Sequence, residues 1–191
     1  MDITAPFGIT VCGIEELAGH CAAGASHVLS ILDPDHPVPE AFGTYGEHEK
    51  LELRFHDIVD PAPHQVTPGP GDVAGILALG RSIQAEARAH LLVHCHAGIS
   101  RSTAAMALIL AQALPDASAD QVLALVHGIR EKAWPNLLLM EMGDTALRRG
   151  GSLVAATHRL HATQMKVRPH IAAFMEELGR HREVEGARAL A

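Results

Sequence analysis

The chain has 191 residues, of which 48% are hydrophobic, so it is long enough for one domain with a sizeable core. Its formal net charge of -7 argues against a general nucleic-acid binder, which needs a basic face to displace counterions. No apolar run approaches the ~20 residues that span a bilayer, and no signal peptide is visible, so we expect no integral membrane contact. Three cysteines are too few for a disulfide framework, which favours a reducing, cytoplasmic location.

The first part of the chain alternates predicted strands with helical and irregular segments. Residues 7–13 predict a short strand, and residues 14–24 predict a helix that ends at a glycine. The apolar run 27–34 predicts a second strand with a proline stop, and 36–50 predicts a loop. In 51–58, apolar residues alternate with polar ones, which is the period-two pattern of a third strand.

The middle of the chain contains a strand followed closely by an alanine-rich helix. Residues 59–72 are rich in proline and glycine and predict an irregular segment, at whose end Asp72 can cap a helix over 73–89. Residues 90–94 then predict a buried strand. The segment 101–113 predicts a helix that stops before a proline.

Helices are predicted for the remainder of the chain. Two are expected over 119–132 and 135–149, and one or two more after a glycine pair, within 150–191. This last stretch is basic, since residues 148–191 carry eight Lys or Arg against four Asp or Glu. We expect one domain over the whole chain, with a core of about 7–149 and a helical C-terminal extension over 150–191.

The alternating elements predict an α/β fold, with a central, mostly parallel sheet flanked by helices on both faces. Ligands of such sheets bind at the carboxyl ends of the strands. The segment at the end of the strand 90–94 is therefore the first place to look for a functional site. It has the sequence HCHAGISRS over residues 94–102.

This segment combines a thiol, a glycine and a guanidinium in a tight strand-to-helix turn. Cys95 leaves the strand at the rim of the sheet, and Gly98 supplies a left-handed backbone conformation at low cost. The backbone N–H groups of the turn and the N-terminus of the following helix form an anion site. Arg101 can hold two oxygens of the same anion, which suits a phosphate group.

The anion site predicts a nucleophilic role for the cysteine. Positive surroundings stabilise the thiolate, so Cys95 is expected to attack phosphorus and form a phosphocysteine. Ser102 can donate a hydrogen bond to the sulfur and make it a better leaving group in the second step. The residues expected to bind the phosphate are His96, Ala97, Gly98, Ile99, Ser100 and Arg101.

HCHAGISRS resembles the signature HC-x5-R-[ST] of cysteine-dependent protein tyrosine phosphatases, and more narrowly that of the small dual-specificity branch and its bacterial relatives. The likeness is good over residues 94–144 and partial over 51–93, so it covers about half of the chain. It implies a three-layer protein tyrosine phosphatase-like architecture and hydrolysis of phosphate monoesters. It implies no metal or other cofactor, because the loop itself supplies the positive field.

The resemblance also implies a general acid and a supporting asparagine outside the signature. Relatives carry the acid on an upstream loop in an F-x-D pattern, which the chain matches at Asp57. Asp60 is the alternative acid, and Asp72 is weaker because its cap role explains it. A Pro-Asn pair after the next helix is also present, and Asn136 would then hold the active-site loop or orient the water. From the residues alone, Asn136 is equally a cap of the helix that follows it.

The histidines and cysteines around the signature have predicted supporting or redox roles. His94 is expected to orient the loop by hydrogen bonding, and His96 to face the mouth or the wall of the pocket. Adjacent His-Cys-His residues lack the spacing of metal ligands, so no metal site is predicted. Cys12 and Cys21 are candidates for resolving thiols of an oxidised Cys95.

The variable positions of the signature bear on the substrate. Lipid-phosphate relatives often carry lysines there, and this chain has none, which favours a phosphorylated protein with phosphotyrosine, and with phosphoserine or phosphothreonine if the pocket is shallow. Aromatic residues make up only 3%, which leaves no obvious wall for a tyrosine ring, so a phosphoinositide or small phosphate-ester substrate stays open. Further alternatives are a rhodanese-like sulfurtransferase or arsenate reductase on a similar loop, and a phosphoprotein-binding module without turnover.

Overall fold

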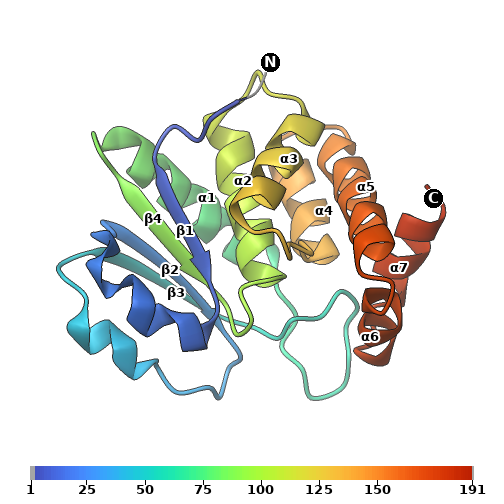
Figure 1. Cartoon of the computed structure of the whole chain (residues 1–191), viewed down its shortest axis with the longest axis horizontal. Helices are drawn as coiled ribbons and strands as arrows, with labels where there is room; N and C mark the ends of the chain where they lie inside the picture. The colour runs from blue at the N-terminus through green and yellow to red at the C-terminus, as the bar shows by residue number, and fades with distance from the viewer. Residues whose placement is uncertain (1–2, 191) are drawn as a thin grey trace.

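The computed structural model describes residues 3–190 and is built around a four-stranded parallel sheet (Figure 1). The strands follow the spatial order β1-β4-β2-β3, and each neighbouring pair is parallel. Their bounds are β1 Gly8–Cys12, β2 His27–Leu32, β3 Glu49–Arg54 and β4 His90–His94. The four predicted strands are confirmed, although β3 begins before residue 51 and ends at Arg54, short of 58.

Two 3-10 helices and seven α-helices occur within residues 3–190. Their bounds are η1 Ile14–Ala23, η2 Glu40–Thr44, α1 Pro70–Ala85, α2 Arg101–Ala113, α3 Ala119–Ile129, α4 Leu137–Ala146, α5 Ser152–Val167, α6 Ile171–Glu177 and α7 His181–Arg188. None of these helices is long and apolar enough to cross a bilayer, as far as the described residues go.

The sheet is enclosed between two helical layers, which is the usual environment of an all-parallel sheet. Helices α1 to α3 cover one face, α4 packs on α1 and α2, and together they supply most of the large hydrophobic core (Figure 1). The two 3-10 helices cover the other face, where Leu17 and Phe42 pack with Val28 and Leu92 of the sheet. The predicted α/β fold with a three-layer architecture is confirmed.

The start of α1 differs from the prediction. The helix begins at Pro70, because the fixed φ of proline suits a first turn and its missing N–H forfeits no hydrogen bond there. Asp72 lies inside this turn, and its carboxylate accepts a hydrogen bond from the N–H of Gly69 at 2.8 Å. The helix ends at Ala85, and the chain turns toward β4 through Arg88, whose φ is 68°.

Other boundaries shift for local reasons. The helix predicted over 14–24 is the 3-10 helix η1, which ends at Ala23, and the predicted loop 36–50 contains η2 and the start of β3. Helix α3 ends at Ile129, before 132. Helix α4 starts at Leu137, after 135, because the side chain of Asn136 caps it, and it ends at Ala146, before 149.

Three helices follow residue 150, where one or two were predicted. Pro169 lies between α5 and α6, and Gly179, with a φ of 74°, lies between α6 and α7. Helix α5 packs along α3 and α4, and α7 packs back on α5. Helix α6 reaches the loop that follows β3 (Figure 1), so the C-terminal helices approach the carboxyl edge of the sheet.

Candidate active site

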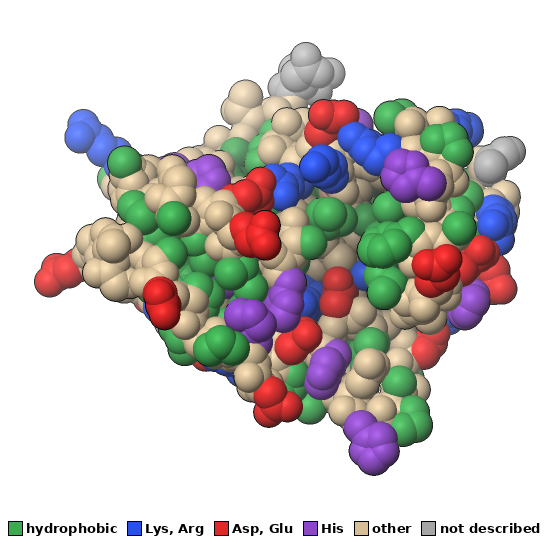
Figure 2. Space-filling model, turned by 60° about the horizontal axis from the view of Figure 1, so that its bottom comes forward, with side chains coloured by type: hydrophobic (Ala, Val, Ile, Leu, Met, Phe, Trp, Pro, Cys, Tyr) green, Lys and Arg blue, Asp and Glu red, His purple; other side chains and the backbone are tan. Residues whose placement is uncertain are grey.

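The signature segment lines a pocket of about 350 Å³ at the carboxyl edge of the sheet. Figure 2 shows this side of the molecule, where acidic, basic and histidine side chains gather around a hollow. We call this cavity the signature pocket. Four stretches of the chain line it, namely Asp33, then His56, Asp57, Ile58 and Gln65, then Cys95, His96, Ala97, Ile99, Ser100 and Arg101, and finally Phe174, Met175, Leu178 and Arg180.

Gly98 turns the signature loop without lining the pocket. Its φ is 68°, and a Cβ at this position would lie 2.4 Å from the carbonyl carbon of Cys12. The backbone on either side is held from outside the pocket, since the N–H of Ile14 donates to the carbonyl of His96 at 2.9 Å. When the carbonyls of such a loop turn away, its N–H groups are left to face an anion.

Arg130, directly after α3, holds two further loop carbonyls and was not predicted. Its Nη2 donates to the carbonyl of Ala97 at 3.1 Å, and its Nε donates to that of Gly98 at 3.0 Å. Glu16 of η1 pairs with the same guanidinium, at 2.8 Å between Oε2 and Nη2. The hydrogen bond from Arg130 holds the pKa of Glu16 below its ordinary value, so the pair stays ionised at neutral pH.

Cys95 is almost fully buried at the end of β4. Its Sγ lies 3.2 Å from the Oγ of Ser102, in the first turn of α2. His94, just before it, places Nε2 at 2.8 Å from the Oγ of Ser30, which ties β4 to β2 next to the thiol. Burial lowers the pKa of His94 to about 4, so its imidazole is neutral at pH 7.

Arg101 is buried and anchored on one side only. Its Nη1 donates to Asp33 Oδ1 and to the carbonyl of Phe55, both at 2.6 Å, while its Nε has no hydrogen-bond partner among the described residues. The guanidinium therefore keeps donors for a ligand. Asp33 was not predicted, and its N–H also donates to Nε2 of His96 at 3.2 Å, at the pocket wall.

Asp57 lies beside the signature loop, and one of its oxygens has three polar partners. Its Oδ1 accepts hydrogen bonds from Ser100 Oγ at 2.8 Å and Asn136 Nδ2 at 2.9 Å, and Arg180 Nη1 lies 3.2 Å away. Burial alone would raise the pKa of Asp57. The charges of Arg180 and Arg101 outweigh this effect and, with the two hydrogen bonds, hold the pKa below its ordinary value.

The other two candidate acids lie outside the signature pocket. Asp60 is half-exposed and pairs with Nε of Arg182 at 2.8 Å. Asp72 serves the first turn of α1. Of the three aspartates, the structure places only Asp57 at the pocket lining.

Asn136 has both of the roles that the sequence left open, as a cap of α4 and as a support of the active site. Its Oδ1 accepts a hydrogen bond from the N–H of Leu139 at 3.1 Å, which caps α4. Its Nδ2 donates to Asp57 and, at 3.1 Å, to the carbonyl of Ile58. The fully buried amide therefore holds the loop that carries Asp57, through the same side chain that starts the helix.

Arg180, just before α7, is a residue of the site that the sequence did not predict. Only 2% of its side chain is exposed, and its Nη1 donates to Ser100 Oγ at 2.8 Å. Its Nη2 donates to Oε1 of Glu183 at 2.6 Å. The carboxylate of Glu183 also accepts from the indole Nε1 of Trp134 at 2.7 Å and from the N–H of Leu137 at 2.9 Å. Glu183 therefore fixes the guanidinium of Arg180 on one side, and its Nη1 faces the signature loop on the other.

All three cysteines are free. Cys12 ends β1 opposite His94 of β4, and burial, followed by the charge of Glu16, raises the pKa of its thiol to about 12. The thiol therefore keeps its proton, which makes it a weak nucleophile toward an oxidised sulfur. Cys21 lies in η1, with its Sγ 3.0 Å from Thr44 Oγ1. A resolving role for either thiol stays a prediction.

Solved structures resemble the chain, although no family model and no curated protein matches its sequence. Human DUSP28 is 15% identical with a TM-score of 0.55, over 74% of this chain and 92% of that one. The Yvh1 phosphatase domain from Chaetomium thermophilum is 22% identical with a TM-score of 0.52, over 79% and 96%. PTPMT1 in complex with PI(5)P is 16% identical with a TM-score of 0.53, over 75% and 94%.

These likenesses span nearly the whole of each solved chain and 74–79% of this one. At such low identity they speak for the fold, and the residues of the site must be judged on their own geometry. The predicted architecture and the structural neighbours agree. The chain therefore shares the fold of the solved DUSP28, Yvh1 phosphatase-domain and PTPMT1 structures.

Proposed function

We propose that the protein is a cysteine-dependent phosphatase that hydrolyses phosphate monoesters through a phosphocysteine intermediate. The observation that carries the proposal is the convergence of Cys95, Arg101 and Asp57 on one pocket. A nucleophile, an anion-binding guanidinium and a carboxyl group are the parts that this chemistry requires. The fold supports the proposal, since one of its structural neighbours is the phosphatase domain of Yvh1.

In the first step, the phosphate dianion of the substrate binds to the N–H groups of residues 96–101 and to Arg101. The Cys95 thiolate attacks phosphorus opposite the leaving oxygen, so an S–P bond forms while the ester P–O bond breaks. Asp57 donates its proton to the leaving oxygen, and the rest of the substrate departs as an alcohol.

In the second step, the Asp57 carboxylate accepts a proton from a water molecule whose oxygen attacks phosphorus. The S–P bond breaks, inorganic phosphate forms, and Cys95 leaves as a thiolate. Ser102, whose Oγ is 3.2 Å from the sulfur, stabilises this thiolate by donating a hydrogen bond. The loop and Arg101 supply the positive field in both steps, so the proposal includes no metal or other cofactor.

Protein phosphotyrosine is the substrate class that we favour, with phosphoserine and phosphothreonine as a second class. Phe174 of α6 is half-exposed and lines the signature pocket, so it offers the aromatic surface that composition did not reveal. A phosphoinositide or small phosphate ester is the alternative, and it draws support from PTPMT1, which was solved with PI(5)P. We propose the cytoplasm as the location, because all three cysteines are free.

The test compares the protein with its Cys95→Ser variant on p-nitrophenyl phosphate. We expect hydrolysis to be lost in the variant while inorganic phosphate still binds, because the amides and Arg101 remain. Full activity of the variant would contradict the mechanism. Turnover of a panel of phosphopeptides and phosphoinositides then decides the substrate class, and a cyanide–thiosulfate assay decides the sulfurtransferase alternative. Phosphopeptide binding without phosphate release would instead indicate a binding module.

A further inference from the structure

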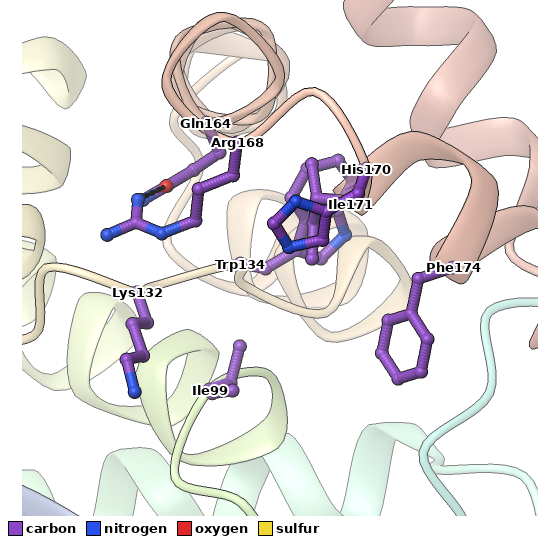
Figure 3. A pocket seen from close by; sticks show the side chains of 8 residues that line it. All are labelled: Ile99, Lys132, Trp134, Gln164, Arg168, His170, Ile171 and Phe174. Atoms are coloured by element: carbon purple, nitrogen blue, oxygen red, sulfur yellow. Dashed lines mark hydrogen bonds between the residues drawn. The ribbon is translucent and has the colours of Figure 1, made fainter.

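A second cavity, of about 420 Å³, adjoins the signature pocket (Figure 3). We call it the side pocket. It lies between the signature loop, the segment before α4, the end of α5 and the start of α6. Its lining residues are Ile99, Lys132, Trp134, Gln164, Arg168, His170, Ile171 and Phe174. Because Ile99 and Phe174 line both cavities, one ligand can occupy the two at once.

The floor of the side pocket is apolar and fixed in place. Trp134 is 1% exposed, and its indole stacks on His161 with the ring centroids 4.0 Å apart and an interplanar angle of 7°. Its Nε1 is held by Glu183 at 2.7 Å. Ile99 and Ile171 belong to the same hydrophobic cluster. A rigid apolar surface of this kind binds a hydrophobic side chain with little loss of its own conformational freedom.

The rim of the side pocket is basic. Lys132, Arg168 and His170 line it, and no Asp or Glu does. Arg168 is occupied, since its Nη2 donates to Glu131 Oε1 at 2.7 Å and its Nη1 donates to Gln164. Lys132 is exposed and forms no ion pair with any described residue. On a chain with a net charge of -7, a basic rim beside an apolar floor is a local feature that complements an acidic group.

We propose that the side pocket binds the residues of a phosphoprotein substrate that flank the phosphorylated one. An apolar side chain packs on Ile171 and Phe174, above the buried Trp134, and a neighbouring carboxylate pairs with Lys132. This inference rests on the proposed phosphatase function and adds a sequence preference to it. A peptide suits the site better than a phosphoinositide, because Arg168 is already paired and Lys132 is left to face an acidic group, which matches one carboxylate rather than the additional phosphates of an inositol headgroup.

The kinetic test uses two phosphotyrosine peptides that differ only in the flanking residues, leucine and glutamate in one and glycine and lysine in the other. We expect the KM of the first peptide to be about tenfold lower, from apolar burial and one rim ion pair. Lys132→Glu should remove most of this difference and leave kcat/KM for p-nitrophenyl phosphate within about twofold, since that substrate fills only the signature pocket. Lys166→Glu is the matched control, because Lys166 is exposed on α5 and does not line the side pocket.

The binding test uses the one tryptophan of the chain, which forms the floor of the side pocket. In the Cys95→Ser variant, the leucine–glutamate peptide should shift the fluorescence of Trp134, whereas inorganic phosphate alone should leave it close to that of the free protein. If the peptide binds but gives the same Trp134 fluorescence spectrum as inorganic phosphate, the inference is overturned. Equal KM values for the two peptides, or a preference for phosphoinositides over both, would overturn it too. Failure of the unmodified protein to hydrolyse p-nitrophenyl phosphate would refute the proposed phosphatase function instead.

Discussion

The pair formed by Asp57 and Arg180 links the geometry of the site to its pH dependence. The proposed first step needs a proton on Asp57, yet the neighbouring guanidinium groups hold its pKa below the ordinary value of an aspartate. In the free protein, the protonated fraction of Asp57 therefore falls as the pH rises through this lowered pKa. The value of kcat/KM should fall along the same limb of the pH profile.

Replacing Arg180 should shift the descending limb of the pH profile of kcat/KM. In Arg180→Met the nearest positive charge is lost, so the pKa of Asp57 rises and the descending limb of kcat/KM shifts to higher pH. A pH profile with phenyl phosphate, whose poor leaving group requires the acid, measures the shift. Arg180→Lys, which keeps the charge, should leave the limb nearer to that of the unmodified protein.

Arg182→Met is the control for this experiment. Arg182 holds the same loop, through the carbonyl of Val59 at 2.6 Å and through Asp60, but it does not contact Asp57. We expect its loss to lower the rate without moving the limb. If Arg180→Met also lowers the rate equally at every pH, Arg180 only supports the structure and does not set the charge state of Asp57.

Among the elements, α3 supports the signature loop through the residue that follows it. Arg130 follows its last turn and holds the carbonyls of Ala97 and Gly98, while Glu16 of η1 orients the guanidinium. Two helices on opposite faces of the sheet, α3 and η1, therefore help to fix the conformation of the signature loop.

Removing the hydrogen bonds from Arg130 should lower the affinity for phosphate more than it lowers the stability of the fold. For Arg130→Met we expect about tenfold losses in phosphate affinity and in kcat/KM, equivalent to ~1.4 kcal/mol, because two charge-assisted hydrogen bonds disappear. Arg149→Met is the matched control, since Arg149 likewise donates to two carbonyls, those of Pro115 and Ala117, away from the pocket. Isothermal titration with phosphate and steady-state kinetics measure both; equal losses in the two variants would show that Arg130 has no specific effect on the loop.

The sequence predicted best those elements whose conformation is determined by neighbouring residues in the chain. Strand β4 is a short, buried, apolar run, and the left-handed Gly98 follows it because only glycine tolerates both that φ and the contact with β1. The start of α1 was misplaced because the pattern around Asp72 fits two positions in a first turn, and Pro70 decides between them. The break at Gly179 was missed because a single glycine near a helical pattern has several interpretations.

At the scale of the whole molecule, the parts of the site that escaped prediction are those brought together by tertiary packing. Asp33 reaches Arg101 because β2 and β4 are neighbours in the sheet, and neither residue's sequence context indicates the other. Arg180 arrives through the packing of α7 on α5, and the only advance signal was the excess of basic residues over 148–191. Motifs indicated the nucleophile and its loop, whereas the counter-charges depend on the complete fold.

A ligand in the signature pocket should stabilise the whole molecule. Phosphate at about a hundred times its Kd should add ~2.7 kcal/mol to the free energy of unfolding, which for a chain of this size raises Tm by about 5–10 °C. Arg101→Met should abolish the increment, whatever its own Tm, and Cys95→Ser should keep it. A thermal melt with and without phosphate measures each increment; an unchanged increment in Arg101→Met would place the anion elsewhere.

The contacts that shape the signature loop and the contact that brings Arg180 to it close similarly long stretches of chain. Arg180 and Ser100 are 80 positions apart, and Arg130 and Glu16 are 114 apart. The entropic cost of closing a loop grows only slowly with its length, so neither set of contacts has a clear advantage during folding. A refolding protein should therefore recover its affinity for phosphate and the pH optimum of kcat/KM in the same kinetic phase.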